Sequence, residues 1–444
     1  MPLAPASRRR GGNEECCAEW NATPFNPSGQ YSYSQQRFCF AHSEQGPGPE
    51  RTYHGPMTEK LPPRRPRYRD AAREPGRVHW MELFFDLVFV AFVGQLAHGI
   101  HGNPGWAEYG TFVLLFFPAW WAWVNIVSVV NLLPGLSSRG LGVAMLAGMA
   151  AAGLMAAAAP EAFGPRAWAF SLANAAMRVV LLVLWLYQHR QKSAGAPLRI
   201  WLYNGGTAAL WLLAALLPLH EAIFLWAGAI AVEVAMVLLG ARLWPERGIG
   251  GINIEHASER LGLFVVIVLG ESIFTIVSEL SSDWGRGGGL AAGLGFLVVA
   301  LLGWAFFQYG TGTVSSGLER LQSRADYSGI LQTTIFMPFL LVVGVTAIAA
   351  AIATAIPAPG QVLPPGAGIA LGGGLALFYG TNAMVSLRYG RPPRTVLPWA
   401  VPAVVAAALL IPASATVPAA AALALAVLIL LALTGYVEIQ RRRR

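Results

Sequence analysis

The sequence is short of charge and of cysteine. Only 12% of its 444 residues are charged, about half the share of a typical globular protein, whereas 55% are hydrophobic. The three cysteines, Cys16, Cys17 and Cys39, all lie in the polar N-terminal stretch. They therefore exclude a disulfide framework in the apolar remainder, whose composition is typical of a polytopic membrane protein.

Several motifs of soluble enzymes are also missing. The sequence contains no Gly-x-x-x-x-Gly-Lys-Ser/Thr phosphate loop, no Cys-x-x-Cys metal pair and no Gly-x-Ser-x-Gly nucleophile elbow. The connections between apolar segments are too short to form a soluble catalytic domain. We therefore expect no ATP-driven pump and no resident cofactor, and an enzyme is the less favoured class.

Residues 1–77 are rich in Pro, Gly, Ser and Arg and lack a periodic apolar pattern, which predicts a disordered cytoplasmic tail. Polar residues, not an apolar core, follow Arg8-Arg9-Arg10, so the pattern does not indicate a signal peptide. The basic run 61–69 serves as a topology signal or contacts anionic lipid headgroups.

Twelve apolar segments follow within residues 78–440, each long enough to cross a bilayer. They predict an all-α polytopic membrane helical bundle. The predicted spans are 80–100, 108–131, 140–160, 166–188, 199–218, 221–242, 256–279, 288–310, 330–356, 365–387, 396–412 and 416–438.

The distribution of Lys and Arg predicts the orientation of the bundle. With the N-terminus inside, the inner connections and the C-terminus hold fifteen Lys or Arg residues, whereas the outer connections hold only Arg166 and Arg286. Arg178 and Arg260 remain within spans. We therefore predict that both termini are cytoplasmic. The net charge of +8 then reflects topology and requires no nucleic-acid partner.

The first span carries His79, Glu82 and Asp86 on one helical face, at spacings i, i+3 and i+7. His79 and Glu82 can reach water at the boundary, but Asp86 lies roughly 10 Å into the core, too deep for its short side chain to do so. A carboxylate at such a depth indicates a functional site or a buried structural pair.

Arg178 in the fourth span and Glu233 in the sixth lie at nearly the depth of Asp86, roughly 18 Å from the outer end of their spans. This depth allows the three residues to form one buried cluster. The cluster is either a structural ion pair or a substrate or ion site.

The seventh span begins with His256 and Glu259 and carries Glu271 in its outer half. The His-x-x-Glu spacing of His79 and Glu82 thus recurs 177 residues later, which is compatible with two six-helix repeats. Two facing pairs would supply a divalent-metal set, but helix-end His and Glu residues usually meet water, so we predict no metal site.

The segments Glu82–Val90 and His256–Phe264, the latter followed by Val268–Ser272, resemble the bacterial low-temperature-requirement A family, LtrA. The resemblance covers residues 78–440 and includes the Trp120–Trp123 stretch with Asn131, Arg178 and the Gly-rich tenth span. It implies a multi-pass protein of the bacterial cytoplasmic (inner) membrane but no particular biochemical activity.

Two positions depart from the family pattern. Gln308 stands where the family often has an acid, and Gln332 stands where we expect a His, which disfavours a proton relay through either position. The first-span segment also resembles, distantly, the Phe-Ser-Asp motif of a group of twelve-span potassium channels built from two six-helix repeats.

We hypothesise a secondary transporter or permease that acts on a small solute or ion in the lipid bilayer. Asp86 and Glu271 would be the coupling or substrate acids, with Arg178 and Glu233 as gate or counter-charges. The remaining candidate binding residues lie at the cytoplasmic starts of the first and seventh spans: His79, Glu82, His256 and Glu259.

Three alternatives stay open. In a cation channel, Asp86 would stabilise the pore helices. In a lipid-active intramembrane enzyme, His79 and His256 would be the acid–base groups. The last alternative is a stress-adaptation protein that transports nothing.

Overall fold

The structure is a computed structural model that describes residues 80–132, 138–192, 198–243, 254–282, 284–324 and 327–442. Within these ranges every regular element is helical, and the one β-type contact is an isolated bridge between Val362 and Pro418. The predicted all-α membrane bundle is thus confirmed. The predicted tail, residues 1–77, lies outside the described residues.

The first half of the bundle contains the helices from α1 to α7. A 3-10 turn, η2 (Ala159–Glu161), follows α3, and α6 continues directly from a short helix and a π-helical segment. The elements are α1 (Trp80–His98), α2 (Trp106–Asn131), α3 (Ser138–Ala158), α4 (Ala167–Lys192), α5 (Leu198–Ile200), η3 (Trp201–Gly205), α6 (Gly206–Leu216) and α7 (Leu219–Leu243).

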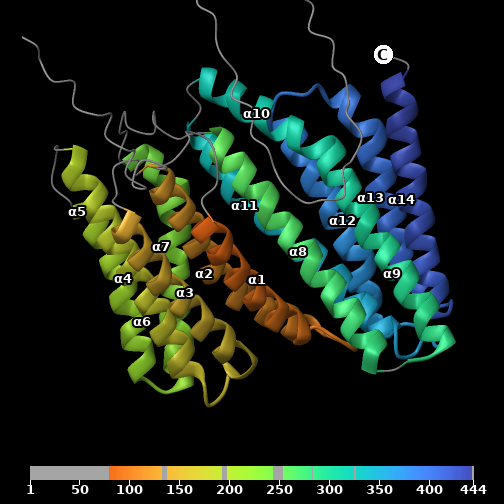
Figure 1. Cartoon of the computed structure of the whole chain (residues 1–444), viewed down its shortest axis with the longest axis horizontal. Helices are drawn as coiled ribbons and strands as arrows, with labels where there is room; N and C mark the ends of the chain where they lie inside the picture. The colour runs from red at the N-terminus through yellow and green to blue at the C-terminus, as the bar shows by residue number, and fades with distance from the viewer. Residues whose placement is uncertain are drawn as a thin grey trace, which may run out of the picture. The chain divides into compact units, whose positions relative to one another are not determined.

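The second half contains the helices from α8 to α14. Figure 1 shows the two halves as separate groups of helices, which meet where α1 packs against α8 and where α11 packs against α1 and α2. The elements are α8 (Ile254–Ser282), α9 (Arg286–Ala305), the π-helical segment η4 (Phe306–Gly310), α10 (Thr311–Ser323), α11 (Tyr327–Ala355), α12 (Pro365–Arg388), α13 (Pro393–Ser414) and α14 (Ala419–Arg442).

Eleven helices of the described part are long and apolar enough to cross a membrane. The remaining predicted span, 199–218, corresponds to the run of α5, η3 and α6, in which a π-helical segment interrupts the α-helix. There the Thr207 hydroxyl donates a hydrogen bond to the carbonyl oxygen of Tyr203 at 2.7 Å. The apolar pattern predicted neither the π-helical segments nor α10, which continues the eighth span beyond its predicted end.

Four packing contacts recur in the two halves. In the first half α1 packs on α3, α3 on α4, α4 on α6, and α6 on α7. In the second half α8 packs on α11, α11 on α12, α12 on α13, and α13 on α14. Counted span by span, these are equivalent neighbours, which favours duplication of a six-helix unit.

Glycines allow the closest helix contacts in the second half. A Cβ added at Gly374 of α12 would lie 2.6 Å from the carbonyl oxygen of Gly344 on α11. A Cβ at Gly372 would lie 2.6 Å from the carbonyl oxygen of Ala407 on α13. Only glycine fits at such distances, so the Gly-rich stretch of α12 sets how tightly three helices pack.

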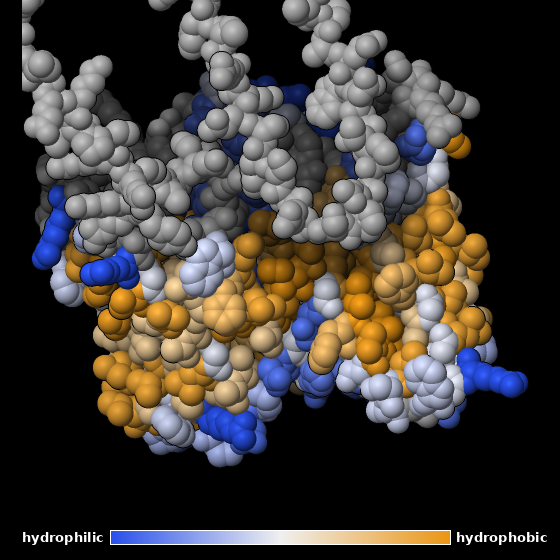
Figure 2. All heavy atoms as spheres, viewed as in Figure 1, coloured by the Kyte–Doolittle hydropathy of each residue, from blue (hydrophilic) through white to orange (hydrophobic). Residues whose placement is uncertain are grey.

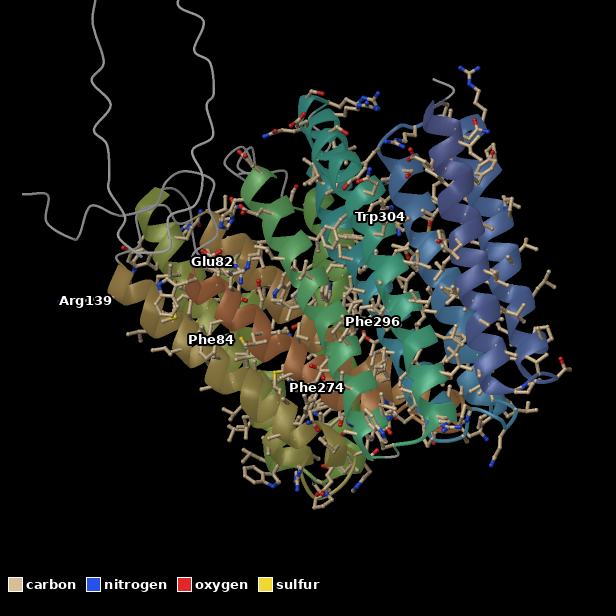
Figure 3. The ribbon with its side chains drawn as sticks, turned by 45° about the vertical axis from the view of Figure 1, so that its right-hand side comes forward. Glu82, Phe84, Arg139, Phe274, Phe296 and Trp304 are labelled. Atoms are coloured by element: carbon tan, nitrogen blue, oxygen red, sulfur yellow. The ribbon has the colours of Figure 1, made fainter. Side chains whose placement is uncertain are left out.

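The surface of the helices is apolar, as contact with lipid requires. Figure 2 shows a broad hydrophobic band on the visible face, with hydrophilic residues along its lower edge. Phe274 and Trp304, both labelled in Figure 3, have exposed fractions of 66% and 59%. Such large exposed side chains are favourable against lipid chains and unfavourable in water.

Candidate functional site

Residues of α1, α2 and α8 form a buried polar cluster. Arg260 donates to both carboxylate oxygens of Asp86, with Nη2 3.0 Å from Oδ1 and Nε 3.3 Å from Oδ2. Glu82 Oε2 lies 3.3 Å from Arg260 Nη1 and 3.2 Å from His256 Nε2. The Trp123 indole donates to Asp86 Oδ1 at 2.7 Å. We refer to these five residues as the α1–α8 cluster.

The helical period explains why these side chains meet. Glu82 and Asp86 are four residues apart on α1, and His256 and Arg260 are four residues apart on α8. Each pair therefore occupies one helix face, and the two helices pack against each other. Figure 3 marks the position with Glu82 on α1. At the edge of the cluster, Asn131 Nδ2 lies 3.4 Å from His256 Nδ1.

Burial makes complete pairing necessary in this cluster. Asp86 and Arg260 have exposed fractions of 0%, and Glu82 has 3%. Removing charged groups from water costs several kcal/mol per ion, which only close pairing offsets. Two carboxylates face one guanidinium, and Glu82 also contacts the His256 ring. The cluster thus fastens α1 to α8 through shared polar contacts.

Glu271 occupies a different position on the same helix pair. A Cβ added at Gly94 of α1 would overlap the Glu271 carboxylate, so the glycine makes room for this half-buried acid. His98, one turn farther along α1, contacts the Gly94 carbonyl oxygen through Nδ1 at 2.8 Å and stacks on His101. Burial and the neighbouring His98 lower the pKa of His101 to about 4, so His101 is neutral at physiological pH.

Apolar side chains separate the α1–α8 cluster from Glu271. Phe89 and Val93 of α1 and Phe264 and Val268 of α8 are buried between the two positions. The Phe264 ring lies 4.5 Å, centroid to centroid, from that of Trp123, directly beside the cluster. Asp86 and Glu271 therefore belong to two separate sites along one interface.

Arg178 and Glu233 form an ion pair of their own. Arg178 Nε lies 2.6 Å from Glu233 Oε1, and Arg178 Nη2 donates to the carbonyl oxygen of Pro118 at 3.1 Å. The two side chains do lie together, but Asp86, which the depth estimate allowed in the same cluster, pairs with Arg260 instead. The depth of a residue in the membrane does not determine which neighbouring helix its side chain faces. The face of α1 that carries Asp86 packs against α8.

A cavity of about 810 Å³ opens among α8, η4 and the helices from α10 to α14. Leu261 and Val265 of α8 line it. The residues directly before them, Arg260 and Phe264, instead face the α1–α8 cluster. Thus α8 separates the cluster from a cavity whose volume is typical of small-molecule sites, roughly 300–1,000 Å³.

Comparison with known proteins assigns the chain to a family. The model of the family described as "Bacterial low temperature requirement A protein (LtrA)" matches residues 77–435. The chain belongs to the LtrA family. An uncharacterized protein of Rhizobium meliloti (strain 1021) is 30% identical over 264 residues, which make up 57% of this chain and 62% of that protein. The match thus spans less than two thirds of that relative's length.

The two segments that resemble LtrA in sequence contact each other in space. The first supplies Glu82 and Asp86 to the α1–α8 cluster, and the second supplies His256 and Arg260. Of the two departures from the family pattern, Gln308 lies in η4 and lines the cavity. The side chain of Gln332 lies outside the described residues.

Glu259, the remaining candidate that the structure describes, belongs to no metal set. Glu259 is exposed, so it does not join Glu82 and His256, and the idea that two His-x-x-Glu pairs face each other is wrong for this acid. His79 lies outside the described residues. Within the part of the chain that the structure describes, no group of three or more His, Cys, Asp or Glu residues is placed to hold a metal ion.

The sequence-based prediction did not include Arg260 among the site residues of this LtrA protein. Electrostatics could have indicated Arg260, because the buried Asp86 carboxylate needs a counter-charge at its own depth. Arg260 lies within the seventh span, four residues beyond His256. The sequence indicated Trp123 only as part of the Trp120–Trp123 stretch, although an indole N–H requires a partner when it is buried. No sequence pattern predicts the cavity, because the residues that line it belong to common types and come from segments far apart in the chain.

Proposed function

We propose that this LtrA protein is a secondary transporter in which the cavity of about 810 Å³ holds the transported solute. The observation that supports this proposal is the position of α8, which bears the α1–α8 cluster on one face and a wall of the cavity on another. A shift of α8 against both α1 and the helices from α10 to α14 would therefore reshape the cavity as well.

Alternating access requires such a coupled element, because one repeat or bundle must move against the other around the solute site. In this proposal the α1–α8 cluster holds the two halves together. Asp86 has both carboxylate oxygens engaged by Arg260, so we assign it to this fastening instead of to solute binding.

Glu271 is the coupling acid in this proposal. Its carboxylate is half-buried beside Gly94 and near His98, at the same helix interface that must open during transport. A proton or cation bound there would change the charge of the interface without breaking the α1–α8 cluster. Acids of this kind mark ion pathways in transporters.

The alternatives receive less support. Arg320, Arg391 and Arg394 line the cavity, and positive charge in the lining repels cations, which disfavours a cation channel. His256 is engaged by Glu82 and Asn131, which favours a positioning role over acid–base catalysis on lipid.

Uptake into proteoliposomes tests the transport function. The full chain would be reconstituted, and radiolabelled organic anions, organic cations and neutral sugars would be offered with and without a pH gradient. We expect saturable uptake of one class and stimulation by unlabelled solute on the opposite side. We expect Glu271→Gln to lower the gradient-driven rate at least tenfold, while the control Glu259→Gln, an exposed acid of the same helix, leaves it unchanged.

Two results would contradict the proposal. One is uptake that rises linearly with concentration, accompanied by single-channel currents, which would identify a channel. The other is the absence of uptake for all three classes in liposomes that contain correctly inserted protein.

A further inference from the structure

The mouth of the cavity is basic. Arg320 of α10 and Arg394 of α13 line it and are exposed, and neither forms an ion pair within the described ranges. Arg391, in the turn between α12 and α13, lines the same mouth. The guanidinium groups of Arg320 and Arg394, which line the same cavity, provide planar donor sets for a carboxylate, sulfonate or phosphate.

The start of α13 adds to this positive potential. The helix begins at Pro393, and no side chain caps its first turn. Arg394 and Thr395, both in this first turn, line the cavity. A helix of 22 residues presents a partial positive charge at its N-terminus, which favours an anion there.

One part of the cavity wall is apolar and aromatic. Met337 and Leu341 of α11, Phe378 of α12 and Trp399 of α13 contribute to this part. Phe378 lies ten residues before the end of α12, so the cavity reaches roughly 15 Å from the basic mouth. Such a wall favours a hydrocarbon or aromatic body over a small inorganic ion.

One buried hydroxyl faces this interior without a partner. Thr381 is 1% exposed and lines the cavity, and its Oγ1 has no hydrogen-bond partner in the described structure. A buried hydroxyl without a partner is costly, so a polar group on a bound molecule would stabilise it. Gln308, in the π-helical segment η4, is another polar side chain of the lining.

We propose that the cavity binds an amphipathic organic anion. Its acidic group lies between Arg320 and Arg394 at the mouth, and its apolar body extends toward Phe378 and Trp399. A hydrogen-bonding group on that body meets Thr381. Only the statement that this anion is the transported solute rests on the proposed transport function, because binding itself does not require transport.

Equilibrium binding to the full chain in phosphatidylcholine nanodiscs tests the anion preference. The probes are naphthalene-2-sulfonate, which is always charged, and its neutral analogue naphthalene-2-sulfonamide. We expect the sulfonate to bind at least tenfold more tightly. The double variant Arg320→Gln/Arg394→Gln should remove this preference, whereas Arg139→Gln, an arginine in the first turn of α3, should retain it.

A hydroxylated probe tests the interior. We expect 6-hydroxynaphthalene-2-sulfonate to bind about fivefold more tightly than the parent sulfonate to the wild type, and equally tightly to Thr381→Val. Because valine has nearly the same shape and removes an unpaired hydroxyl, this variant should fold as the wild type does. An unchanged gain in Thr381→Val would overturn the proposed orientation of the ligand.

Competition identifies the source of the anion. Displacement of the sulfonate by dihexanoyl phosphatidylglycerol, but not by dihexanoyl phosphatidylcholine, assigns the site to an anionic lipid. No displacement by either assigns it to a water-soluble anion.

Other outcomes separate this proposal from the transport function. Equal binding of sulfonate and sulfonamide by the wild type, or an undiminished preference in the double arginine variant, would overturn the anion site even if uptake of another solute persists. Loss of all uptake with intact sulfonate binding would overturn the transporter and leave the site.

Discussion

Arg260 is shared by two acids. Its guanidinium engages both oxygens of Asp86 and one oxygen of Glu82, with all three side chains buried. Glu82 in turn contacts His256, so the charge of each member depends on the others. Arg260 therefore acts as one member of the α1–α8 cluster. A single substitution in this cluster measures mainly the cost of the buried charge that it leaves without a partner.

Substitution of the buried pair gives the first prediction. Asp86→Leu removes one of the two acids bound to Arg260 and should lower the free energy of unfolding by about 3–5 kcal/mol, because it leaves buried charge poorly compensated. Arg260→Met should have a cost of the same order. The double variant should lose less than the sum of the two, since neither charge remains from the pair.

Denaturant unfolding of the purified protein in detergent measures this cycle. Glu259→Gln, an exposed acid next to Arg260, is the matched control and should change stability by at most about 0.5 kcal/mol. Strict additivity of the two single losses would show that Asp86 and Arg260 do not stabilise each other.

At the scale of elements, backbone contact determines how the second half packs. The glycines of α12 bring its backbone against those of α11 and α13, so these helices touch without intervening side chains. The face of α12 that carries Thr381 then lines the cavity farther along the helix. The same helix thus combines a tightly packed segment with part of a solute site.

Adjacent glycines of α12 give a prediction with an internal control. Gly374→Ala should destabilise the protein by about 1–3 kcal/mol, because the added Cβ would lie 2.6 Å from the Gly344 carbonyl oxygen and force α11 and α12 apart. At Gly373 the nearest atom is Ile369 Cγ2 at 3.9 Å, so Gly373→Ala should be neutral or slightly stabilising.

Thermal unfolding of the two variants, monitored by tryptophan fluorescence, checks this expectation. Equal melting temperatures for both alanine variants would mean that the close contact between α11 and α12 contributes little to stability.

At the scale of the whole molecule, orientation decides what the cavity can bind. The predicted topology places the starts of α1 and α8 and the basic mouth of the cavity on the cytoplasmic side. An anion would then enter from the cytoplasm, while Glu271 would lie nearer the outer side.

Cysteine labelling tests this orientation. After Cys16, Cys17 and Cys39 are replaced by serine, one cysteine is introduced as Trp284→Cys, between α8 and α9, or as Glu319→Cys, on α10. Both positions are exposed, Trp284 by 83%. We expect a membrane-impermeant maleimide to label Trp284→Cys on intact cells and Glu319→Cys only after permeabilisation. The opposite labelling pattern would invert the bundle and place the cavity mouth outside.

The amino-acid sequence by itself determined the helical class, the positions of the spans and the family, since hydrophobicity is a local property that a linear pattern records directly. It also singled out Asp86, because a deep carboxylate is costly wherever the helix lies. The structure alone decided that Asp86 pairs with Arg260 and not with Arg178, that Glu271 forms a separate site, and that α8 borders a basic cavity. These features depend on how each helix is rotated about its axis, which is set by packing between segments far apart in the chain.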